Sequence, residues 1–371
     1  MNLLDRYIAR QYLINVIALF AILFSFVVMI DLSVNFDRFA DAGLDYSIAR
    51  GDEDPNFFKH TYLTIFMVYD LWWPRLVQLF GFMLGVVLVG AMGFTTAQLS
   101  RNRELLAILA AGQSLHRLIR PVLIVACGLT VVQAVNQELL VPKVAPLLGR
   151  DHGDIGQPIV SVDAVELVSD GDRLRLRADE FDADRGTLTG VFAMIVDETG
   201  RAEAIVRASG ATWEGGGWRL ENPVTEPRQP GAPTDLTFLD TPLDPVRLRT
   251  QRDATFRQAL SFTQAGEILE HGDLLDPRTE AELTRVRFGR FTVMLANLLA
   301  IIIVSPFFLN RQPDGLLQRT LRGTPIAMLA LMGGVLGSSA AIPGLPPALS
   351  VFLPVAILAP VAVTAISSVK T

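Results

Sequence analysis

The stretch RLVQLFGFMLGVVLVGAMGFTTAQL, Arg75–Leu99, contains no charged residue after its first position. A helix needs about 20 predominantly apolar residues to cross the hydrocarbon core of a bilayer. This stretch meets that length without interruption. It therefore predicts a membrane-spanning helix.

Other stretches of the chain have the same character, and they lie on both sides of a more polar central region. They are Tyr12–Leu32, Leu118–Leu140, Phe288–Leu309, Leu345–Val369 and the shorter, uncharged Gly323–Ala341. The sequence thus predicts six membrane helices, three before and three after the central region. The apolar segment Thr61–Trp73 is short and ends at Pro74, so we interpret it as an interfacial extension of the second span.

Composition agrees with a membrane protein. Hydrophobic residues make up 50% of the chain and charged residues 19%, whereas soluble domains contain about a quarter charged residues. The net charge of −6 and the lack of a long basic run argue against a nucleic-acid partner. Cys127 is the only cysteine, which rules out an intramolecular disulfide and leaves a packing role. The first apolar stretch is longer than the roughly 7–15 apolar residues of a signal peptide, so we expect it to be retained.

Short loops rich in Lys and Arg mark the cytoplasmic side of a membrane protein. Such residues precede the first span and follow the second, the fourth and the sixth: Arg6, Arg10, Arg101, Arg103, Arg117, Arg120, Arg311, Arg319, Arg322 and Lys370. The opposite side has Arg38, Arg50 and Lys59 in its first loop, among many acidic residues. We therefore expect cytoplasmic termini and a central domain on the outer side.

The central region, residues 151–250, has the pattern of a β domain. Asp172–Arg177 alternates with period two, and Val191–Val196, Ala204–Ala208 and Trp218–Leu220 continue the series between turn signals. Short strands at this spacing favour a sandwich or jelly roll. The Pro-rich stretch Pro223–Pro233 is interpreted as a loop. The predicted organisation is residues 1–150 with three spans, the β domain, a helical re-entry segment at 251–287, and three spans in 288–371.

No catalytic constellation is recognisable in the sequence. A Gly-Lys pair for phosphate binding, a helical histidine pair and a nucleophile elbow are all absent. We therefore predict neither an enzyme nor a bound metal or cofactor. Asp31 and Asn136 lie near predicted outer helix ends and are interpreted as solvated, whereas Asn297 lies deeper and is expected to bond a neighbouring helix.

The segment Ser100–Gly112, SRNRELLAILAAG, lies between the second and third spans. Its leucines and isoleucine recur at helical spacing, Glu104 complements the helix dipole and Gly112 suits a helix stop. Two interpretations stay open. The helix lies passively against the membrane face, or it is a coupling helix, at about 101–112, that inserts into a groove of a separate ATPase. The residues that would make that contact are Glu104, Leu105, Leu106, Ile108, Leu109 and Gly112.

The order of these features resembles the LptF/LptG permeases, which extract lipopolysaccharide from the inner membrane. The resemblance includes Leu4–Ile8 before the first span, the R-E-L-L-A-I-L-A-A-G pattern at Arg103–Gly112, and six spans divided by a jelly-roll insert. The segment from Leu260 to Arg290, leading into an apolar span, looks like the family's re-entry into the membrane. The N-terminal residues are more similar to LptG than to LptF.

The resemblance implies a half-transporter. Its partners would be a paralogous, LptF-like permease, an LptB-like ATPase dimer on the coupling helices, an LptC/LptA-like periplasmic bridge protein, and the lipopolysaccharide. It also implies that the first and fifth spans form lateral gates for the lipid. The fifth span contains Gly333, Gly334 and Gly337, whose small size permits either close packing or a mobile gate surface.

One departure concerns the outer end of the first span, where LptG proteins often have lysines suited to lipid A phosphates. Here Arg38 is the only cation, among Asp37, Asp41 and Asp45. Other cations flank the predicted outer rim, and we hypothesise that the set replaces the lysines as anion contacts: Arg38, Arg75, Arg285, Arg287 and Arg290. The alternative is that these arginines merely anchor helix ends. A substrate less phosphorylated than enteric lipopolysaccharide also stays open.

Two other functions remain possible at this point. The chain could be a permease of another ABC exporter, although lipoprotein release systems usually have four spans. It could also be a non-transporting scaffold with an extracytoplasmic β domain, in which an exposed amphipathic coupling helix would have no purpose.

Overall fold

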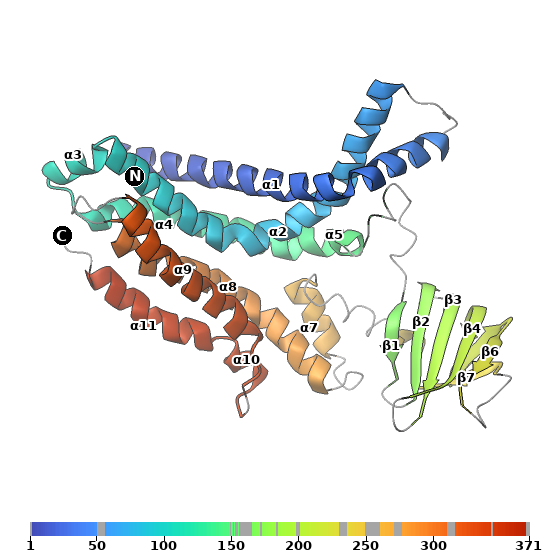
Figure 1. Ribbon diagram of the computed structural model, residues 1–371. Helices are drawn as coiled ribbons and strands as arrows, with labels where there is room; N and C mark the ends of the chain where they lie inside the picture. The colour runs from blue at the N-terminus through green and yellow to red at the C-terminus, as the bar shows by residue number, and fades with distance from the viewer. Residues whose placement is uncertain are drawn as a thin grey trace. The chain divides into compact units, whose positions relative to one another are not determined.

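The computed structural model describes residues 2–49, 56–148, 150, 152, 155, 165–170, 173–182, 185–197, 201–229, 236–248, 260–270, 277–309, 316–342 and 344–368. The chain divides into two units (Figure 1). The membrane unit comprises residues 1–144 and 284–371, and the β unit comprises residues 145–283.

The membrane unit is made of helices. They are α1 (Leu3–Ala49), α2 (Phe57–Arg101), α3 (Glu104–Ala110), α4 (Leu115–Val135), the π-helix η1 (Asn136–Leu140), most of α8 (Pro277–Phe308), α9 (Leu316–Ser339), α10 (Pro347–Ser350) and α11 (Leu353–Ser368). Helix α5 (Val141–Leu148) continues η1 into the β unit.

Five helices in the described part of the chain are long and apolar enough to cross a membrane. They overlap the first, second, third, fourth and sixth predicted spans, which confirms an integral membrane protein with an inserted β domain. The fifth predicted span is also helical, since α9 covers it, but α9 is not among the five. That α9 crosses the membrane therefore stays a prediction.

Helix α1 is much longer than the predicted first span, which was expected to end at Leu32. Its 47 residues correspond to about 70 Å, more than twice the roughly 30 Å thickness of the hydrocarbon core. The helix bends at Asn35, whose φ of −117° and ψ of 24° are not helical. The expectation of a loop around Arg38 is therefore wrong, because this part of the chain is helical.

Helix α2 includes both the predicted second span and the segment Thr61–Trp73 before it. Pro74 lies inside α2 and has no backbone N–H, so the helix lacks one hydrogen-bond donor at this position. The helix changes direction between its first turns and the rest (Figure 1). A proline is the usual cause of such a bend.

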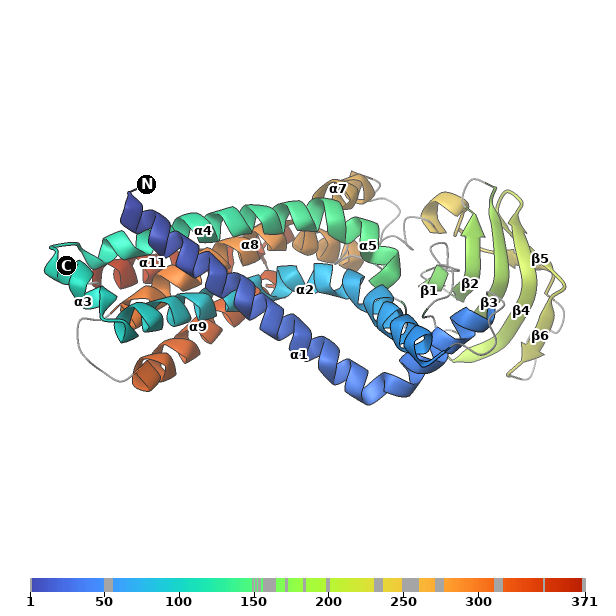
Figure 2. The same ribbon diagram turned by 90° about the horizontal axis from the view of Figure 1, so that it is seen from above.

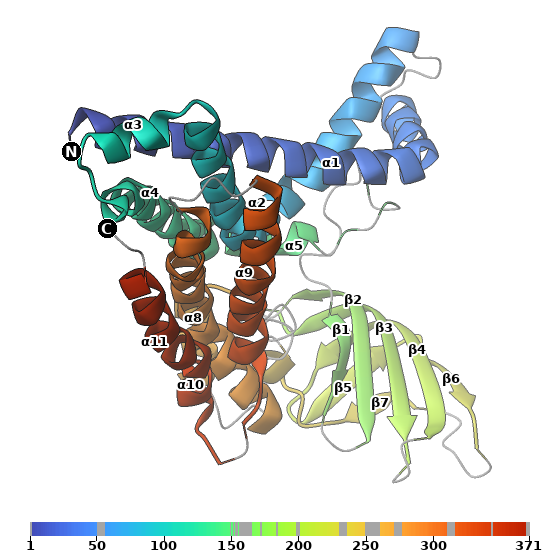
Figure 3. The same cartoon turned by 60° about the vertical axis from the view of Figure 1, so that its left-hand side comes forward.

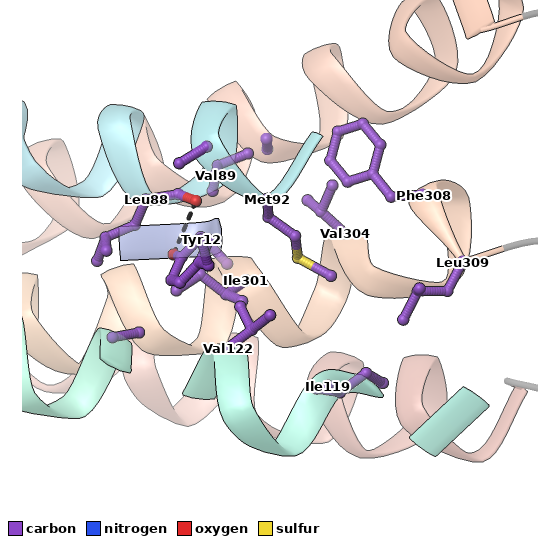
Figure 4. Close-up of a cluster of buried hydrophobic side chains, with 14 of the residues drawn as sticks. Tyr12, Leu88, Val89, Met92, Ile119, Val122, Ile301, Val304, Phe308 and Leu309 are labelled. Carbon is purple, nitrogen blue, oxygen red and sulfur yellow. Dashed lines mark hydrogen bonds between the residues drawn. The ribbon is translucent and has the colours of Figure 1, made fainter. Parts of the chain in front are cut away.

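The centre of the membrane unit is an apolar cluster to which α1, α2, α4 and α8 contribute. Tyr12 of α1 is fully buried there, and its hydroxyl donates a hydrogen bond to the carbonyl oxygen of Leu88 in α2 at 3.0 Å (Figure 4). Val122 of α4 and Ile301 of α8 lie in the same cluster. A buried hydroxyl without a partner would cost about 1–3 kcal/mol, so this bond fixes the position of α1 along α2.

Helix α4 is attached to α2 by two side-chain amides. Gln133 donates to the carbonyl oxygen of Gly81 at 2.8 Å, and Asn136 donates to that of Val77 at 2.9 Å. Asn136 is also the first residue of the π-helix, where the wider turn locally changes the direction of side chains. The interpretation of Asn136 as a solvated helix end is wrong, since it is buried and bonded to a neighbouring helix.

The described strands of the β unit form one antiparallel sheet. Its strands are β1 (Val165–Ser169), β2 (Leu174–Asp182), β3 (Thr187–Val196), β4 (Ala202–Trp213), β5 (Gly217–Glu221), β6 (Val224–Pro227) and β7 (Phe238–Asp240). They are ordered β1-β2-β3-β4-β5-β7, and β6 pairs with β4 beside β5. The long strand β4 therefore has β3 along one edge and two shorter strands along the other.

The sheet curls so that its apolar face closes on itself (Figure 3). Phe181 of β2 and Trp218 of β5 have ring centroids 6.4 Å apart, although β3 and β4 lie between these strands in the sheet. In a flat sheet the two strands would be about 14 Å apart. Trp218 is fully buried, and its indole N–H donates to the carbonyl oxygen of Leu243 at 2.8 Å.

The turn between β4 and β5 follows from its glycines. Gly215 and Gly216 have φ values of 55° and 129°, which residues with a Cβ rarely adopt. Across this turn Arg219 forms an ion pair with Glu214 at 2.6 Å, and the hydrogen bond from Arg219 holds the pKa of Glu214 below its ordinary value. The predicted turn at this position is thereby confirmed.

The Pro-rich stretch is not entirely a loop. Within it, β6 pairs with β4, with Val224 opposite Arg207 and Pro227 opposite Ala204. Proline is tolerated because β6 is short and pairs only with β4 among the described strands. The interpretation of residues 224–227 as loop is therefore wrong.

Helix α7 (Phe262–Glu270) begins with a reciprocal cap. The backbone N–H of Gln264 donates to the Ser261 hydroxyl at 3.0 Å, and the backbone N–H of Ser261 donates to the Gln264 side chain at 2.9 Å. This capping box satisfies two backbone donors at the start of the helix. Leu260, Ala265 and Leu283 form a small buried cluster beside it.

We expect Trp218→Ala to destabilise the β unit by about 3–5 kcal/mol, because it empties the space between β2 and β5. The measurement is limited proteolysis of the full chain in detergent over a urea series, following cleavage within residues 145–283. Val224→Ala, at a side chain that is 61% exposed, is the matched control and should leave the cleavage midpoint unchanged. Equal midpoints for Trp218→Ala and wild type would contradict this account of the sheet.

Candidate functional site

Helix α3 is a short helix with defined ends between α2 and α4. It starts after Arg103, whose left-handed backbone (φ 59°) turns the chain sharply out of α2. It ends at Ala110, and at Gly112 (φ 74°) just beyond it the N–H groups of Gly112 and Gln113 donate to the carbonyl oxygens of Leu109 and Ile108. This is a Schellman motif, which requires a left-handed residue and so explains the glycine.

The apolar residues of α3 divide between two faces. Leu105 is 5% exposed and belongs to the buried cluster of the membrane unit, and Ile108 and Leu109 pack against that cluster. Leu106 is 60% exposed, and the neighbouring Ala107 is exposed as well. The predicted contact residues are therefore not equivalent, because Leu105 holds α3 on the membrane unit while Leu106 faces outward.

Glu104 is bonded within the chain. One carboxylate oxygen accepts a hydrogen bond from the Tyr7 hydroxyl at 2.9 Å, and the other accepts from the side-chain amide of Asn102 at 3.2 Å. Tyr7 lies 97 residues earlier, in α1. Sequence reasoning missed this partner, although Tyr7 stands in the same N-terminal segment, Leu4–Ile8, that was noted for its resemblance.

That N-terminal segment lies against the connection between α2 and α4. Ile8 is 1% exposed and belongs to the same buried cluster as Leu105, and Asp5 forms an ion pair with Arg117 of α4 at 3.9 Å. The start of α1, helix α3 and the end of α11 all lie at one end of the membrane unit (Figures 1 and 2). The structure thus brings together two segments that the sequence analysis considered separately.

The five candidate anion-binding arginines have different surroundings. Arg38 is exposed on α1 beyond the bend. Arg75 lies over the ring of Trp72, 5.7 Å from its centroid, and Arg287 lies at the same distance from the ring of Phe288. Arg285 and Arg290 are half-buried on α8.

Two acidic residues near these arginines have polar partners. Arg290 interacts electrostatically with Glu138 of the π-helix. Asp31 of α1 accepts hydrogen bonds from the Trp72 indole at 2.8 Å and from the Asn35 amide at 2.7 Å. The interpretation of Asp31 as a solvated end is therefore wrong. Among the described residues, no group of three His, Cys, Asp or Glu side chains could hold a metal ion.

The three glycines of α9 also differ from one another. A Cβ added at Gly334 would lie 2.5 Å from the Cβ of Ala296 in α8, and one added at Gly337 would overlap Pro354 in α11. A Cβ at Gly333 would meet nothing within 4 Å. Gly334 and Gly337 therefore permit the close packing of α9 on α8 and α11, whereas Gly333 lies on an open face.

We expect Gly334→Ala to destabilise the membrane unit by about 1–3 kcal/mol, since the added methyl group has no room beside Ala296. The measurement is the midpoint of heat-induced loss of monodisperse protein in detergent, followed by size-exclusion chromatography. Gly333→Ala adds the same methyl group one position earlier, on the open face, and should leave the midpoint unchanged. A lower midpoint for Gly333→Ala than for Gly334→Ala would contradict the packing described.

The comparison with known families fits this arrangement. The sequence matches the family described as "Lipopolysaccharide export system permease LptF/LptG" over residues 56–367. No curated protein matches the chain. The match includes α2, α3 and the β unit but begins after α1, so Leu4–Ile8 lies outside it, and the closer similarity to LptG stays a prediction. Because the match covers most of the chain, this protein belongs to the LptF/LptG family of lipopolysaccharide export system permeases.

Proposed function

We propose that this chain is one permease subunit of an ABC transporter that extracts lipopolysaccharide, or a related glycolipid, from the inner membrane. The lipid would pass to a periplasmic bridge protein on its way to the outer membrane. The family match over residues 56–367 is the observation that supports this function most directly. This chain would move a lipid and would catalyse no covalent step.

The partners follow from the same proposal. A second, paralogous permease would complete the lipid-sized cavity, with α1 and α9 as candidate lateral gates. ATP hydrolysis would take place in a separate cytoplasmic ATPase dimer. The loop charges favour cytoplasmic termini and a periplasmic β unit. The location of α3, the start of α1 and the end of α11 at one end of the membrane unit is consistent with that orientation (Figure 3).

Helix α3 is the proposed docking element for the ATPase. Its outward face offers Leu106 and small alanines, and the exposed Arg101 and Arg103 precede it. Burying a leucine side chain stabilises a complex by about 1.5–3 kcal/mol, and a small surface around it lets a partner groove approach closely. The buried Leu105 and the Schellman cap hold the helix in place, so docking would cost little ordering entropy.

We expect Leu106→Asp to release the ATPase while leaving the permease folded, because it places a charge where apolar contact is proposed. The chain would be expressed with its paralogous permease and a cytoplasmic Lpt-type ATPase, and the ATPase retained on a tagged permease would be quantified. The wild type should retain it, and the variant should lose about tenfold or more.

Leu345→Asp is the matched control, since Leu345 is 44% exposed and precedes α10, away from α3. It should retain the ATPase like the wild type. If the wild-type chain never holds an ATPase, the energy-coupled exporter is wrong and a scaffold role with an extracytoplasmic β domain takes its place. If Leu106→Asp retains the ATPase fully, docking takes place elsewhere on the chain.

The anionic headgroup of the lipid is the proposed ligand of the rim arginines. The guanidinium groups of Arg38, Arg75, Arg285 and Arg287 can each donate two parallel hydrogen bonds to a phosphate or carboxylate oxygen pair. Arg290 interacts with Glu138, so we propose that it also has a structural role. These proposed roles go beyond the family assignment, and they require that the lipid headgroup is anionic.

We expect the double variant Arg287→Gln/Arg290→Gln to lower the amount of anionic glycolipid that co-purifies with the complex by about threefold or more. Lipid extraction and mass spectrometry, normalised to protein, measure this. Arg247→Gln, in the β unit, is the control for a general loss of positive charge. Unchanged lipid binding in the double variant would leave these two arginines as helix anchors only.

A further inference from the structure

The hydrogen bond between Tyr7 and Glu104 joins α1 to α3. The two oxygens lie 2.9 Å apart, and a hydroxyl that donates to a carboxylate makes a charge-assisted bond. Tyr7 is 46% exposed, so its ring is not required to fill a core. Removal of the hydroxyl therefore breaks this link between α1 and α3 without emptying a buried core.

Tyr7 is the first member of a polar stripe along α1. Tyr7, Gln11 and Asn15 are spaced i, i+4 and i+8, which places them on one line of a helix. Gln11 donates to Gln98 at 2.7 Å, and Asn15 donates to Thr95 at 2.9 Å, both on α2. Three successive hydrogen bonds thus hold the first turns of α1 to the end of α2 and the start of α3.

The route of the chain shows why such bonds are needed. Helix α3 is joined covalently to α2 and α4, whereas α1 is joined to α2 only at its other end, between Ala49 and Phe57. The first turns of α1 therefore follow α3 only through side-chain contacts. In the described residues, the Tyr7–Glu104 bond and the buried cluster that includes Ile8 and Leu105 link α1 to α3 itself, whereas the Asp5–Arg117 ion pair and the rest of the polar stripe link α1 to α4 and α2.

We propose that Tyr7 is a positioning residue that transmits the displacement of α3 to α1 through the Glu104 carboxylate. When a docked ATPase moves α3, the bond makes the first turns of α1 move with it, in addition to the covalent route through α2 and α4. The inference rests on the proposed function, since it assumes that the ATPase docks on α3. It assigns to Glu104 a partner inside the chain that the family assignment does not supply.

The test uses the assembled complex of both permeases and the ATPase in proteoliposomes. Tyr7→Phe removes only the hydroxyl and keeps the ring. We expect ATPase retention, ATP turnover and heat stability to match the wild type, while lipid released per ATP hydrolysed falls by roughly fivefold. A merely structural role would change stability or retention and leave the ratio of lipid to ATP unchanged.

Tyr69→Phe is the matched control, because Tyr69 lies on α2 with its side chain 64% exposed. It should keep the wild-type ratio of lipid to ATP. An unchanged ratio in Tyr7→Phe, beside a wild-type complex that binds ATPase and transports lipid, overturns this inference and leaves the proposed function standing. A wild-type complex that holds no ATPase overturns both this inference and the proposed function. A Tyr7→Phe variant that loses heat stability or ATPase retention shows that the hydroxyl has a structural role, and this overturns the inference.

Discussion

Inside a bilayer, a polar group that leaves water can find a replacement partner only within the protein. In this chain helix α2 supplies those partners. Its backbone carbonyl oxygens accept hydrogen bonds at three places: Leu88 from Tyr12 of α1, Gly81 from Gln133 of α4, and Val77 from Asn136 of the π-helix η1. Carbonyl oxygens in a helix have a second lone pair, so these bonds form without breaking the helix. The positions of α1 and α4 along α2 are thereby fixed.

The location of α3 depends on that arrangement. The register of α1 on α2 brings Tyr7 to the start of α3, where it meets Glu104. A shift of α1 by one residue would rotate its polar stripe by about 100° and separate all three pairs. The segment that would meet the ATPase and the helix that would admit the lipid are therefore positioned by the same contacts. This juxtaposition supports the proposed coupling between a docked ATPase and the movement of lipid.

The β unit is held by a different principle. Its strands alternate buried and exposed residues, as in β2, and the curl of the sheet lets Phe181 and Trp218 meet across its apolar face. A single flat sheet of this size would leave that face in water. The curled sheet therefore covers its own apolar face, as a second layer would, and Trp218 is the central contact.

The sequence alone determined the class of this protein. Uncharged apolar runs, period-two strands and the order of the segments were enough to predict a membrane protein with an inserted β domain and the LptF/LptG family. These features are local, since each depends on the composition of one continuous stretch. The helical continuation beyond Leu32 was missed. The strand at Val224–Pro227 was also missed, because pairing with β4 stabilises a segment whose local signals are weak. Only the tertiary structure decided that Leu105 is buried while Leu106 faces outward, that Gly334 is packed while Gly333 is open, and that Tyr7 meets Glu104. Each of these depends on which residue from a distant part of the chain lies opposite, and no local pattern contains that information.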